Sequence, residues 1–215
     1  MTEINKCHII VSMKEMDDKS KILKYATQKG AICSKDIEKM GIPRLVLYRL
    51  YKKGDLVRIN RGVYSLRDIE PTEYHTYVTV AVTFPNAVIC LLSALQYHEL
   101  TTQMPHKVWI ALDRQVDRIS RKPSRLPVSI VRFSGEAFSL GIETHQVEGV
   151  NLRVYSAAKT VADCFKYRNK IGLDVAIEAL TDCIRQKKAT RDQIWQYAKI
   201  CRVANVIRPY MEAIS

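Results

Sequence analysis

Three short segments between residues 19 and 53 carry apolar residues at the spacing of an α-helix. The first segment, "KSKILKYATQK", covers residues 19–29 and is followed by Gly30, a residue that commonly ends helices. We therefore predict a helix over residues 19–29. Its apolar residues share one face: Ile22, Leu23 and Ala26.

The second segment, "CSKDIEKMG", has the residue types of a short capped helix. We predict Ser34 as its N-cap, because a serine hydroxyl can accept a hydrogen bond from the backbone of the first turn. Ile37 and Met40 would form the buried side, and Gly41 would end the helix.

The third segment begins after Gly41, and we expect Pro43 in the first turn of its helix, where a proline loses no needed hydrogen bond. At about 100° per residue, Val46, Leu47 and Leu50 cluster on one side and are predicted to face the core. The opposite side would face solvent, and it carries Arg44, Leu45, Tyr48, Arg49 and Lys52.

After Gly54 the pattern changes to that of two short strands, around Leu56-Val57 and Val63-Tyr64, joined by the turn "INRG". Three helices followed by a two-stranded hairpin is the element order of a winged helix-turn-helix. In that fold the third helix lies in the DNA major groove, and the hairpin contacts the flanking backbone. An ordinary small helical domain with a basic face is the alternative.

The remainder of the chain predicts a second, mixed domain. A boundary is expected within residues 66–73, and helices are expected over residues 73–84 and 87–98. The strand-like runs "KVWIALD", "PVSIVRFS", "IETHQV" and "NLRVYS" follow, and then helices with Ser156 and Thr190 as caps. The predicted fold class is α+β, an N-terminal winged helix-turn-helix domain followed by an α+β domain with a small sheet and terminal helices. The domain bounds are 1–18 for an N-terminal extension, 19–70 for the winged domain and 71–215 for the second domain.

Positive charge is concentrated in the predicted winged domain. The chain of 215 residues carries a net charge of +12, and residues 19–67 hold thirteen basic residues against three acidic ones. So dense a charge repels itself, and an anionic partner relieves the repulsion. Double-stranded DNA is the expected partner, and a merely solubilising surface is the alternative. We expect Arg44, Tyr48, Arg49 and Lys52 to face the major groove, and Lys35, Lys39, Lys53, Arg58 and Arg61 to neutralise phosphates.

Other chemistry finds little support in the sequence. No apolar run is long enough to span a membrane, and no signal peptide is evident, so we expect a cytoplasmic protein. The six cysteines form no C-x-x-C pair and are expected to be buried thiols rather than zinc ligands or disulfides. The five histidines lack the spacing of a helical metal site, and Asp163 is expected to make a local hydrogen bond or salt bridge. We therefore predict no cofactor, no metal and no enzymatic activity.

The stretch "GIPRLVLYRLYKKGDLVRINRGVYSL" resembles the winged domain of the AbiEi family, the antitoxins of type IV toxin–antitoxin systems. The matching residues are Leu50, Lys52, Lys53, Gly54, Leu56, Val57, Arg58, Arg61, Gly62, Val63 and Tyr64. The segments "AVICLLSALQYHELT" and "VYSAAKTVADCFKYRNKIGLDVAIEAL" are similar to later parts of the family. There the matching residues are Ser156, Lys159, Thr160, Asp163, Cys164 and Phe165, and residues 1–18 fall outside the resemblance.

The resemblance implies a cytoplasmic protein encoded beside a nucleotidyltransferase toxin, in a system linked to abortive infection and phage defence. The winged domain would bind inverted repeats in its own promoter and repress the operon. The C-terminal domain would counteract the toxin without a stable complex. The chain would be a monomer or weak dimer that binds DNA cooperatively, because one small winged domain contacts few base pairs.

Two other functions stay open from the sequence. The first is a ligand-responsive winged-helix transcription regulator without a toxin partner, whose C-terminal domain would hold an apolar pocket. The second is a nucleic-acid enzyme, which would need clustered acids near the basic loop at residues 114–125. Only Asp113 and Asp117 lie there, each next to an arginine. The same loop would alternatively touch DNA or RNA, or be a plain solvated loop.

Overall fold

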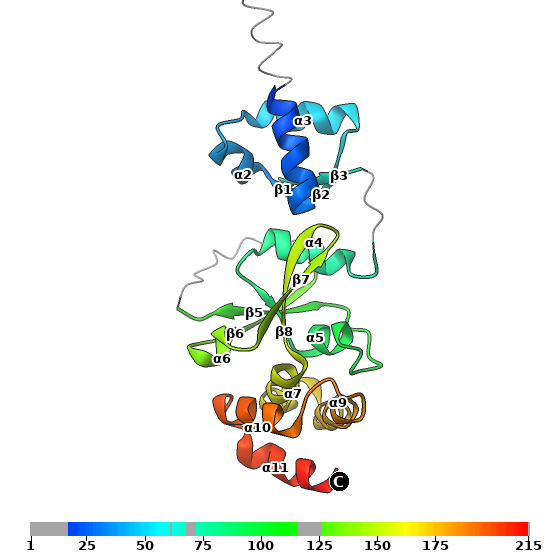
Figure 1. The fold of residues 1–215 in the computed structure, drawn as a ribbon, viewed down its shortest axis with the longest axis vertical. Helices are drawn as coiled ribbons and strands as arrows, with labels where there is room; N and C mark the ends of the chain where they lie inside the picture. The colour runs from blue at the N-terminus through cyan, green and yellow to red at the C-terminus, as the bar shows by residue number, and fades with distance from the viewer. Residues whose placement is uncertain (1–16, 61, 68–71, 116–125, 215) are drawn as a thin grey trace, which may run out of the picture. The chain divides into compact units, whose positions relative to one another are not determined.

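The computed structural model describes residues 17–60, 62–67, 72–115 and 126–214 (Figure 1). It is a mixed α+β structure, as predicted, and the described residues form two sheets. The chain divides into two compact units. We call Met1–Pro85 with Gln146–Asn151 the N-terminal unit, and Asn86–His145 with Leu152–Ser215 the C-terminal unit. None of the helices in the described ranges combines the length and the apolar character that crossing a bilayer requires.

The N-terminal unit contains the predicted three helices and hairpin. A helix over residues 17–29 is followed by β1 (Ala31–Cys33), α2 (Ser34–Lys39), α3 (Arg44–Lys53), β2 (Leu56–Asn60), β3 (Val63–Leu66) and α4 (His75–Thr83). The strands form an antiparallel sheet in the order β1-β3-β2. The helices fit a helix-turn-helix, and β1 is an element that the sequence pattern did not predict.

The core of this unit forms from the apolar faces of its helices and from the sheet. Ile22, Leu47 and Leu56 are almost completely buried. Fully burying a side chain of this size contributes about 1.5–3 kcal/mol. The whole cluster is Ile22, Ala26, Ile32, Ile37, Ile42, Val46, Leu47, Leu50, Leu56 and Tyr64.

Met40 is not part of this core, so the prediction that it is buried was wrong. Helix α2 ends at Lys39, and the chain then turns at Gly41, whose φ is +74°. After this turn Ile42 enters the core, whereas Met40 stays 41% exposed. The helical spacing that predicted a buried Met40 no longer applies there, because the helix has already ended.

Ser34 is not the N-cap of α2, which also corrects the sequence prediction. Cys33 occupies that position and makes no side-chain cap. The Ser34 hydroxyl and backbone N–H both donate to the carbonyl oxygen of Gly62, at 3.1 and 2.8 Å. Cys33 pairs with Val63, and this pairing places the start of α2 against the β2–β3 turn. The Ser34 hydroxyl therefore donates to the nearby carbonyl oxygen of Gly62 and does not accept a hydrogen bond from the backbone of its own helix.

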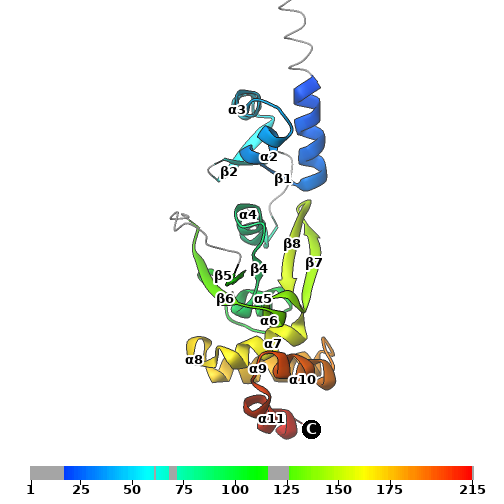
Figure 2. The same ribbon diagram turned by 90° about the vertical axis from the view of Figure 1, so that its left-hand side faces the viewer.

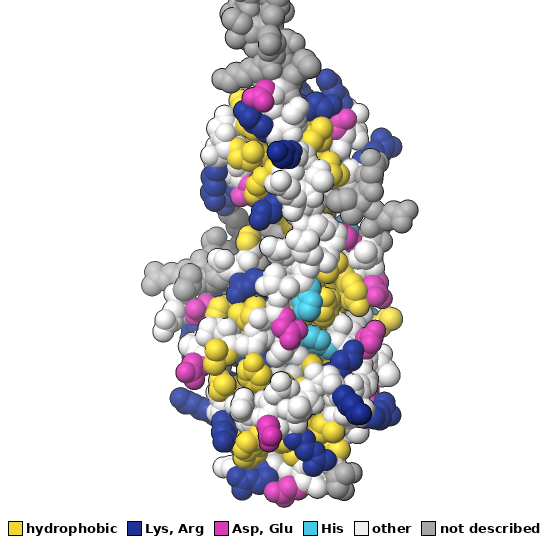
Figure 3. Space-filling model, viewed as in Figure 1, with side chains coloured by type: hydrophobic (Ala, Val, Ile, Leu, Met, Phe, Trp, Pro, Cys, Tyr) yellow, Lys and Arg dark blue, Asp and Glu magenta, His cyan; other side chains and the backbone are white. Residues whose placement is uncertain are grey.

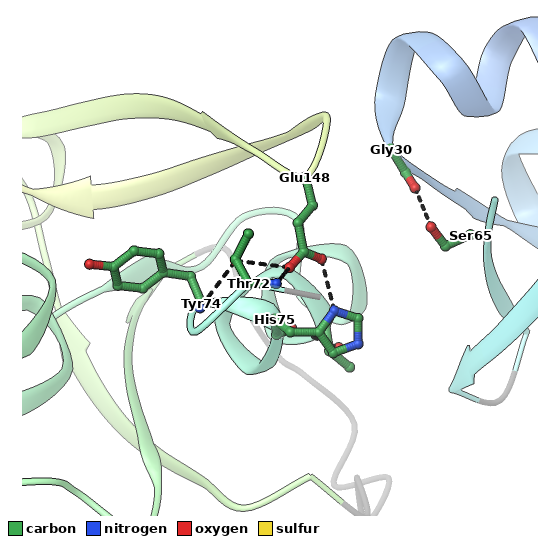
Figure 4. Close-up of polar contacts among 7 residues, drawn as sticks. Gly30, Ser65, Thr72, Tyr74, His75 and Glu148 are labelled. Atoms are coloured by element: carbon green, nitrogen blue, oxygen red, sulfur yellow. Dashed lines mark hydrogen bonds and ion pairs between the residues drawn. The ribbon is translucent and has the colours of Figure 1, made fainter. Parts of the chain in front are cut away.

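The turn between β7 (Ile142–Val147) and β8 (Val150–Tyr155) belongs to the N-terminal unit. A Cβ atom on Gly30 would lie 2.0 Å from the carbonyl oxygen of Glu148, so only glycine fits at this approach. The Glu148 carboxylate accepts hydrogen bonds from the backbone N–H and the hydroxyl of Thr72, at 2.7 and 2.9 Å. It also lies 2.8 Å from Nδ1 of His75, and Figure 4 shows the side chain reaching from the turn to both residues.

The C-terminal unit contains a five-stranded sheet in the order β6-β5-β4-β8-β7. The four predicted strands are present as β5 (Val108–Asp113), β6 (Val128–Phe133), β7 and β8. A fifth, β4 (Val88–Ile89), lies where a helix was predicted, so α5 (Leu91–Tyr97) begins later than expected. Val88 and Ile89 pair with β5, and this pairing keeps the segment extended.

The helices predicted after the sheet are also present. They are α7 (Ala157–Lys166), α9 (Leu173–Arg185), α10 (Arg191–Ile200) and α11 (Ala204–Ala213), with short helices α6 (Glu136–Ser139) and α8 (Arg168–Ile171) in addition. The predicted caps Ser156 and Thr190 are confirmed. Figure 2 shows α7 to α10 as a layer beyond the ends of the strands, with α11 on its far side.

Helix α7 is the centre of this unit, since its residues 157–165 are all buried. Lys159 and Asp163 form a fully buried ion pair, with Nζ and Oδ2 2.5 Å apart. The thiol of Cys201 donates to the other Asp163 oxygen at 3.2 Å. The Lys159 ammonium also lies over the rings of Phe133 and Tyr155, 4.7 and 4.2 Å from their centroids. The predicted salt bridge of Asp163 is thus confirmed.

The cysteines behave largely as expected. Cys90, Cys164, Cys183 and Cys201 are buried free thiols, and Cys33 is half-buried. Cys7 lies outside the described residues. Burial raises the pKa of Cys201 to about 12 and that of Cys183 to about 11.

The domain bounds 1–18, 19–70 and 71–215 stay a prediction. The two compact units cross them, because α4 and the β7–β8 turn pack with the N-terminal unit. Val78 and Val150 share a small apolar cluster with Ala31 and Val63, which explains this packing.

Candidate nucleic-acid interface

Helix α3 has well-defined signals at both ends. Pro43 is the N-cap in an extended conformation, one position before the first turn in which it was expected. Gly54 follows the helix with a left-handed φ of +81°. The N–H of Gly54 donates to Tyr51 and the N–H of Asp55 to Leu50, at 3.1 and 3.0 Å. This is the Schellman arrangement, which satisfies the last carbonyls of the helix and turns the chain into β2.

The two faces of α3 lie as the sequence predicted. Val46, Leu47 and Leu50 are buried, so the opposite face points to solvent. Leu45 is 55% exposed and Tyr48 49% exposed. The exposed residues on this side are Arg44, Leu45, Tyr48, Arg49 and Lys52, which we call the outer face of α3.

Tyr48 on the outer face is connected to the core of the unit by contacts between aromatic rings. Tyr51 lies between Tyr48 and the core residue Tyr64, with ring centroids 6.3 and 5.8 Å away. The Lys52 ammonium lies over the Tyr48 ring at 5.7 Å. A cation at this distance is attracted by the ring quadrupole. Tyr48 is therefore in contact with both a neighbouring ring and a cation.

Arg44 already has an anionic partner within the protein. Its Nε lies 2.5 Å from Oε1 of Glu38, and its Nη2 lies 2.8 Å from Oε2. Both side chains are well exposed, so solvent screens the pair. The sequence gives no sign of this contact, because two residues six positions apart across a turn carry no helical spacing signal.

The residues expected to contact phosphates are exposed wherever the structure describes them. Lys35 and Lys39 lie on α2, Lys53 ends α3 and Arg58 lies on β2. Arg61 lies outside the described residues. Most of the basic loop 114–125 also lies outside them.

Few acids oppose this positive charge. Besides Glu38, Asp55 is paired, because Lys19 on the first helix lies 2.9 Å from its carboxylate. Asp36 lies in the first turn of α2, where a negative charge stabilises the helix end. Figure 3 shows Lys and Arg side chains spread over the visible face of the N-terminal unit, with fewer Asp and Glu side chains among them.

The arrangement suits binding of a polyanion. Helix α3 has ten residues, so it is about 15 Å long and of a size that enters a DNA major groove. Arginine can bond guanine or phosphate, whereas lysine and tyrosine can serve bases or phosphates. No cluster of His, Cys, Asp and Glu within the described ranges could hold a metal ion.

Comparison with known proteins agrees with this geometry. Residues 20–67 match a family model described as "Transcriptional regulator, AbiEi antitoxin", which confirms the resemblance over that segment. No curated protein matches the chain. Among solved structures, the chain is similar to the RV2827C protein from Mycobacterium tuberculosis, with a TM-score of 0.54 and 13% identity. That match covers 85% of this chain and 71% of the other, and at this identity it speaks for the fold alone.

Proposed function

We propose that this chain is a DNA-binding antitoxin of a type IV toxin–antitoxin system. It represses its own operon through a winged helix-turn-helix and counteracts a nucleotidyltransferase toxin through its C-terminal domain. The observation that carries the proposal is the outer face of α3, cationic and solvent-facing, within the segment that matches the AbiEi family.

In this function α3 lies in the major groove, and the β2–β3 hairpin is the wing. Arg44 and Arg49 are the candidates for bidentate bonds to guanine, and Tyr48 and Lys52 contact bases or phosphates. Lys35, Lys39, Lys53, Arg58 and Arg61 neutralise phosphates. About six such contacts would make the affinity fall roughly a thousandfold between 50 and 200 mM salt.

The target is a pair of inverted repeats in the promoter of the protein's own operon. One unit presents a single ten-residue helix, which contacts only a few base pairs. Two copies on half-sites one or two helical turns apart supply the remaining specificity. We propose that the protein is a monomer or weak dimer that binds such repeats cooperatively.

The antitoxin activity is assigned to the C-terminal domain, in the cytoplasm and without a stable complex with the toxin. The resemblance in the segment around Ser156, Lys159 and Asp163 supports this assignment. Its role would lie in defence against phage by abortive infection.

The DNA-binding part is tested with the full chain and a duplex containing the region upstream of its gene. A mobility shift should detect binding that weakens steeply with salt, and a promoter reporter should be repressed. The wild type is compared with the double variant Arg49→Ala, Lys52→Ala, which changes two residues on the exposed side of α3. A wild-type chain that binds this duplex no better than random duplexes would contradict operon repression.

The antitoxin part is tested by co-expressing the neighbouring gene with the full-length Arg49→Ala, Lys52→Ala variant. A truncated chain starting at residue 72 is unsuitable, because residues 72–85 and 146–151 belong to the N-terminal unit. Restored growth would assign toxin neutralisation to a part of the chain outside α3. Failure by a folded variant and by the wild type would favour a regulator without a toxin partner.

A further inference from the structure

Two large apolar side chains lie in the middle of the cationic outer face of α3. Leu45 is 55% exposed and Tyr48 is 49% exposed. At about 100° per residue, the direction opposite the buried residues 46, 47 and 50 passes between them. Lys52 shares this central strip, whereas Arg44 and Arg49 lie on either side of it. Leu45 therefore projects outward, and the described residues leave more than half of its side chain uncovered.

The charge around Leu45 indicates what could cover it. An apolar protein surface docked on this face would have to desolvate the neighbouring Arg44, Arg49 and Lys52, which is costly without matching acids. DNA supplies anionic phosphates for the cations. Its major groove also offers one apolar group among polar base edges, the 5-methyl group of thymine.

The position of Leu45 within α3 agrees with such a contact. Leu45 is the second residue of the helix. Residues near the N-terminus of a recognition helix contact base edges, while the first helix of the motif crosses the backbone. Tyr48 lies one turn further along the same strip, and its ring is held by Tyr51 and Lys52.

We propose that α3 recognises thymine through its 5-methyl group, with Leu45 as the contacting side chain and Tyr48 beside it. This inference rests on the proposed function, because it requires α3 to lie in the major groove. It adds a chemical prediction to that function: each half-site contains a thymine whose methyl group contributes to affinity. An arginine flanking Leu45 that bonds a base rather than a phosphate would add a preference for guanine next to that thymine.

The inference is tested with the full chain and a duplex selected from a random-sequence pool. Each thymine in the selected site is replaced in turn by deoxyuridine, which removes only the methyl group and keeps the base pair. We expect a loss of about fourfold at one thymine of each half-site, the value for one buried methyl group. The Leu45→Ala variant should bind more weakly and lose no further affinity at that position.

Two further variants distinguish the loss of a contact between Leu45 and thymine from a general effect of substitution on the folded protein. Leu45→Met keeps an apolar side chain and should keep the sensitivity to deoxyuridine. Met104→Ala changes a methionine that is 83% exposed in the C-terminal unit, and should behave like the wild type.

The outcomes distinguish the inference from the function on which it rests. Equal binding after every thymine replacement overturns the methyl contact and leaves DNA binding standing. An effect of deoxyuridine that is the same in the wild type and in Leu45→Ala overturns the role of Leu45. If Leu45→Ala changes the oligomeric state in the absence of DNA, the strip is a protein interface and the inference fails. If no duplex is selected, the proposed function fails as well.

Discussion

Glu38 on α2 and Arg44 at the first residue of α3 face each other across the turn between the two helices. Two nitrogen–oxygen contacts of 2.5 and 2.8 Å join the carboxylate to the guanidinium. This is the fork geometry that arginine uses with phosphate or guanine. Arg44 therefore has to leave Glu38 before this pair of nitrogens can contact DNA, and Glu38 then sets part of the cost of binding.

The first prediction concerns Glu38→Gln. We expect this variant to bind the promoter duplex about two- to fivefold more tightly, the range of an exposed ion pair. If Arg44 then contacts a phosphate, the slope of log affinity against log salt should steepen by about 0.9. The affinity is measured by fluorescence anisotropy at several salt concentrations.

The matched control is Asp17→Asn. Asp17 is also exposed and also forms an ion pair, with Lys21 four residues later on the first helix. Its removal changes the net charge equally but leaves Arg44 and Glu38 in place. Equal gains from both variants would mean that overall charge, rather than release of Arg44, controls the affinity.

Arg49→Ala is expected to weaken promoter binding by about 1–3 kcal/mol and to relax the base preference at one position. Lys53→Ala should instead weaken binding equally for all sequences and reduce the salt slope by about one. Competition with single-base variants of the duplex distinguishes the two effects. Unchanged binding by Arg49→Ala would remove this residue from the interface.

Asp163→Ala is expected to destabilise the C-terminal unit by about 3–5 kcal/mol. The substitution leaves the fully buried Lys159 ammonium without its carboxylate, and an uncompensated buried charge is strongly unfavourable. Urea unfolding followed by the fluorescence of Trp109 and Trp195, which both lie in this unit, measures the change. The double variant Lys159→Met, Asp163→Leu should lose less stability, because it removes both charges together. A loss of stability equal to that of Asp163→Ala would contradict an electrostatic cause.

Glu148→Gln should lower stability at neutral pH by about 1–3 kcal/mol. The reason is that a neutral amide forms weaker hydrogen bonds with Thr72 and His75 than the charged carboxylate does. Burial alone would raise the pKa of Glu148, but hydrogen bonds from Thr72 and His75 outweigh it and lower the pKa below 4.5. A carboxylate with a lowered pKa stabilises the fold above its ordinary pKa and loses this effect as the pH falls through the folded value. The difference between wild type and variant should therefore shrink below about pH 4.5.

The control for this variant is Glu143→Gln. Glu143 lies on β7 near His145, but its side chain is 46% exposed. Its substitution should change stability by less than about 0.5 kcal/mol. A pH-independent loss in Glu148→Gln would show that packing, rather than charge, accounts for the effect.

The four buried cysteines should resist thiol labelling until the protein unfolds. Burial raises the pKa of Cys90, Cys164, Cys183 and Cys201, so the reactive thiolate is scarce near neutral pH. Mass spectrometry after brief alkylation at pH 8 should find these four unmodified in the native chain. Labelling of Cys201 at the rate of a free thiol would contradict the described contact with Asp163.

The sequence by itself determined the helices of the N-terminal unit, the β2–β3 hairpin and the outward direction of Arg44, Leu45, Tyr48, Arg49 and Lys52. These features depend on local rules, since a helix repeats every few residues and Gly54 ends α3 by its own backbone freedom. The family resemblance lies in the same locally encoded segment.

Only the tertiary structure decided which polar side chains are paired. Ser34 looked like a helix cap, but its acceptor is Gly62, 28 residues away. Glu148 binds Thr72 across 76 positions, and β1 and β4 exist because distant strands pair with them. Hydrogen bonds and ion pairs form between whichever groups the fold brings within about 3 Å, and a single sequence has no periodic pattern that records such long-range neighbours.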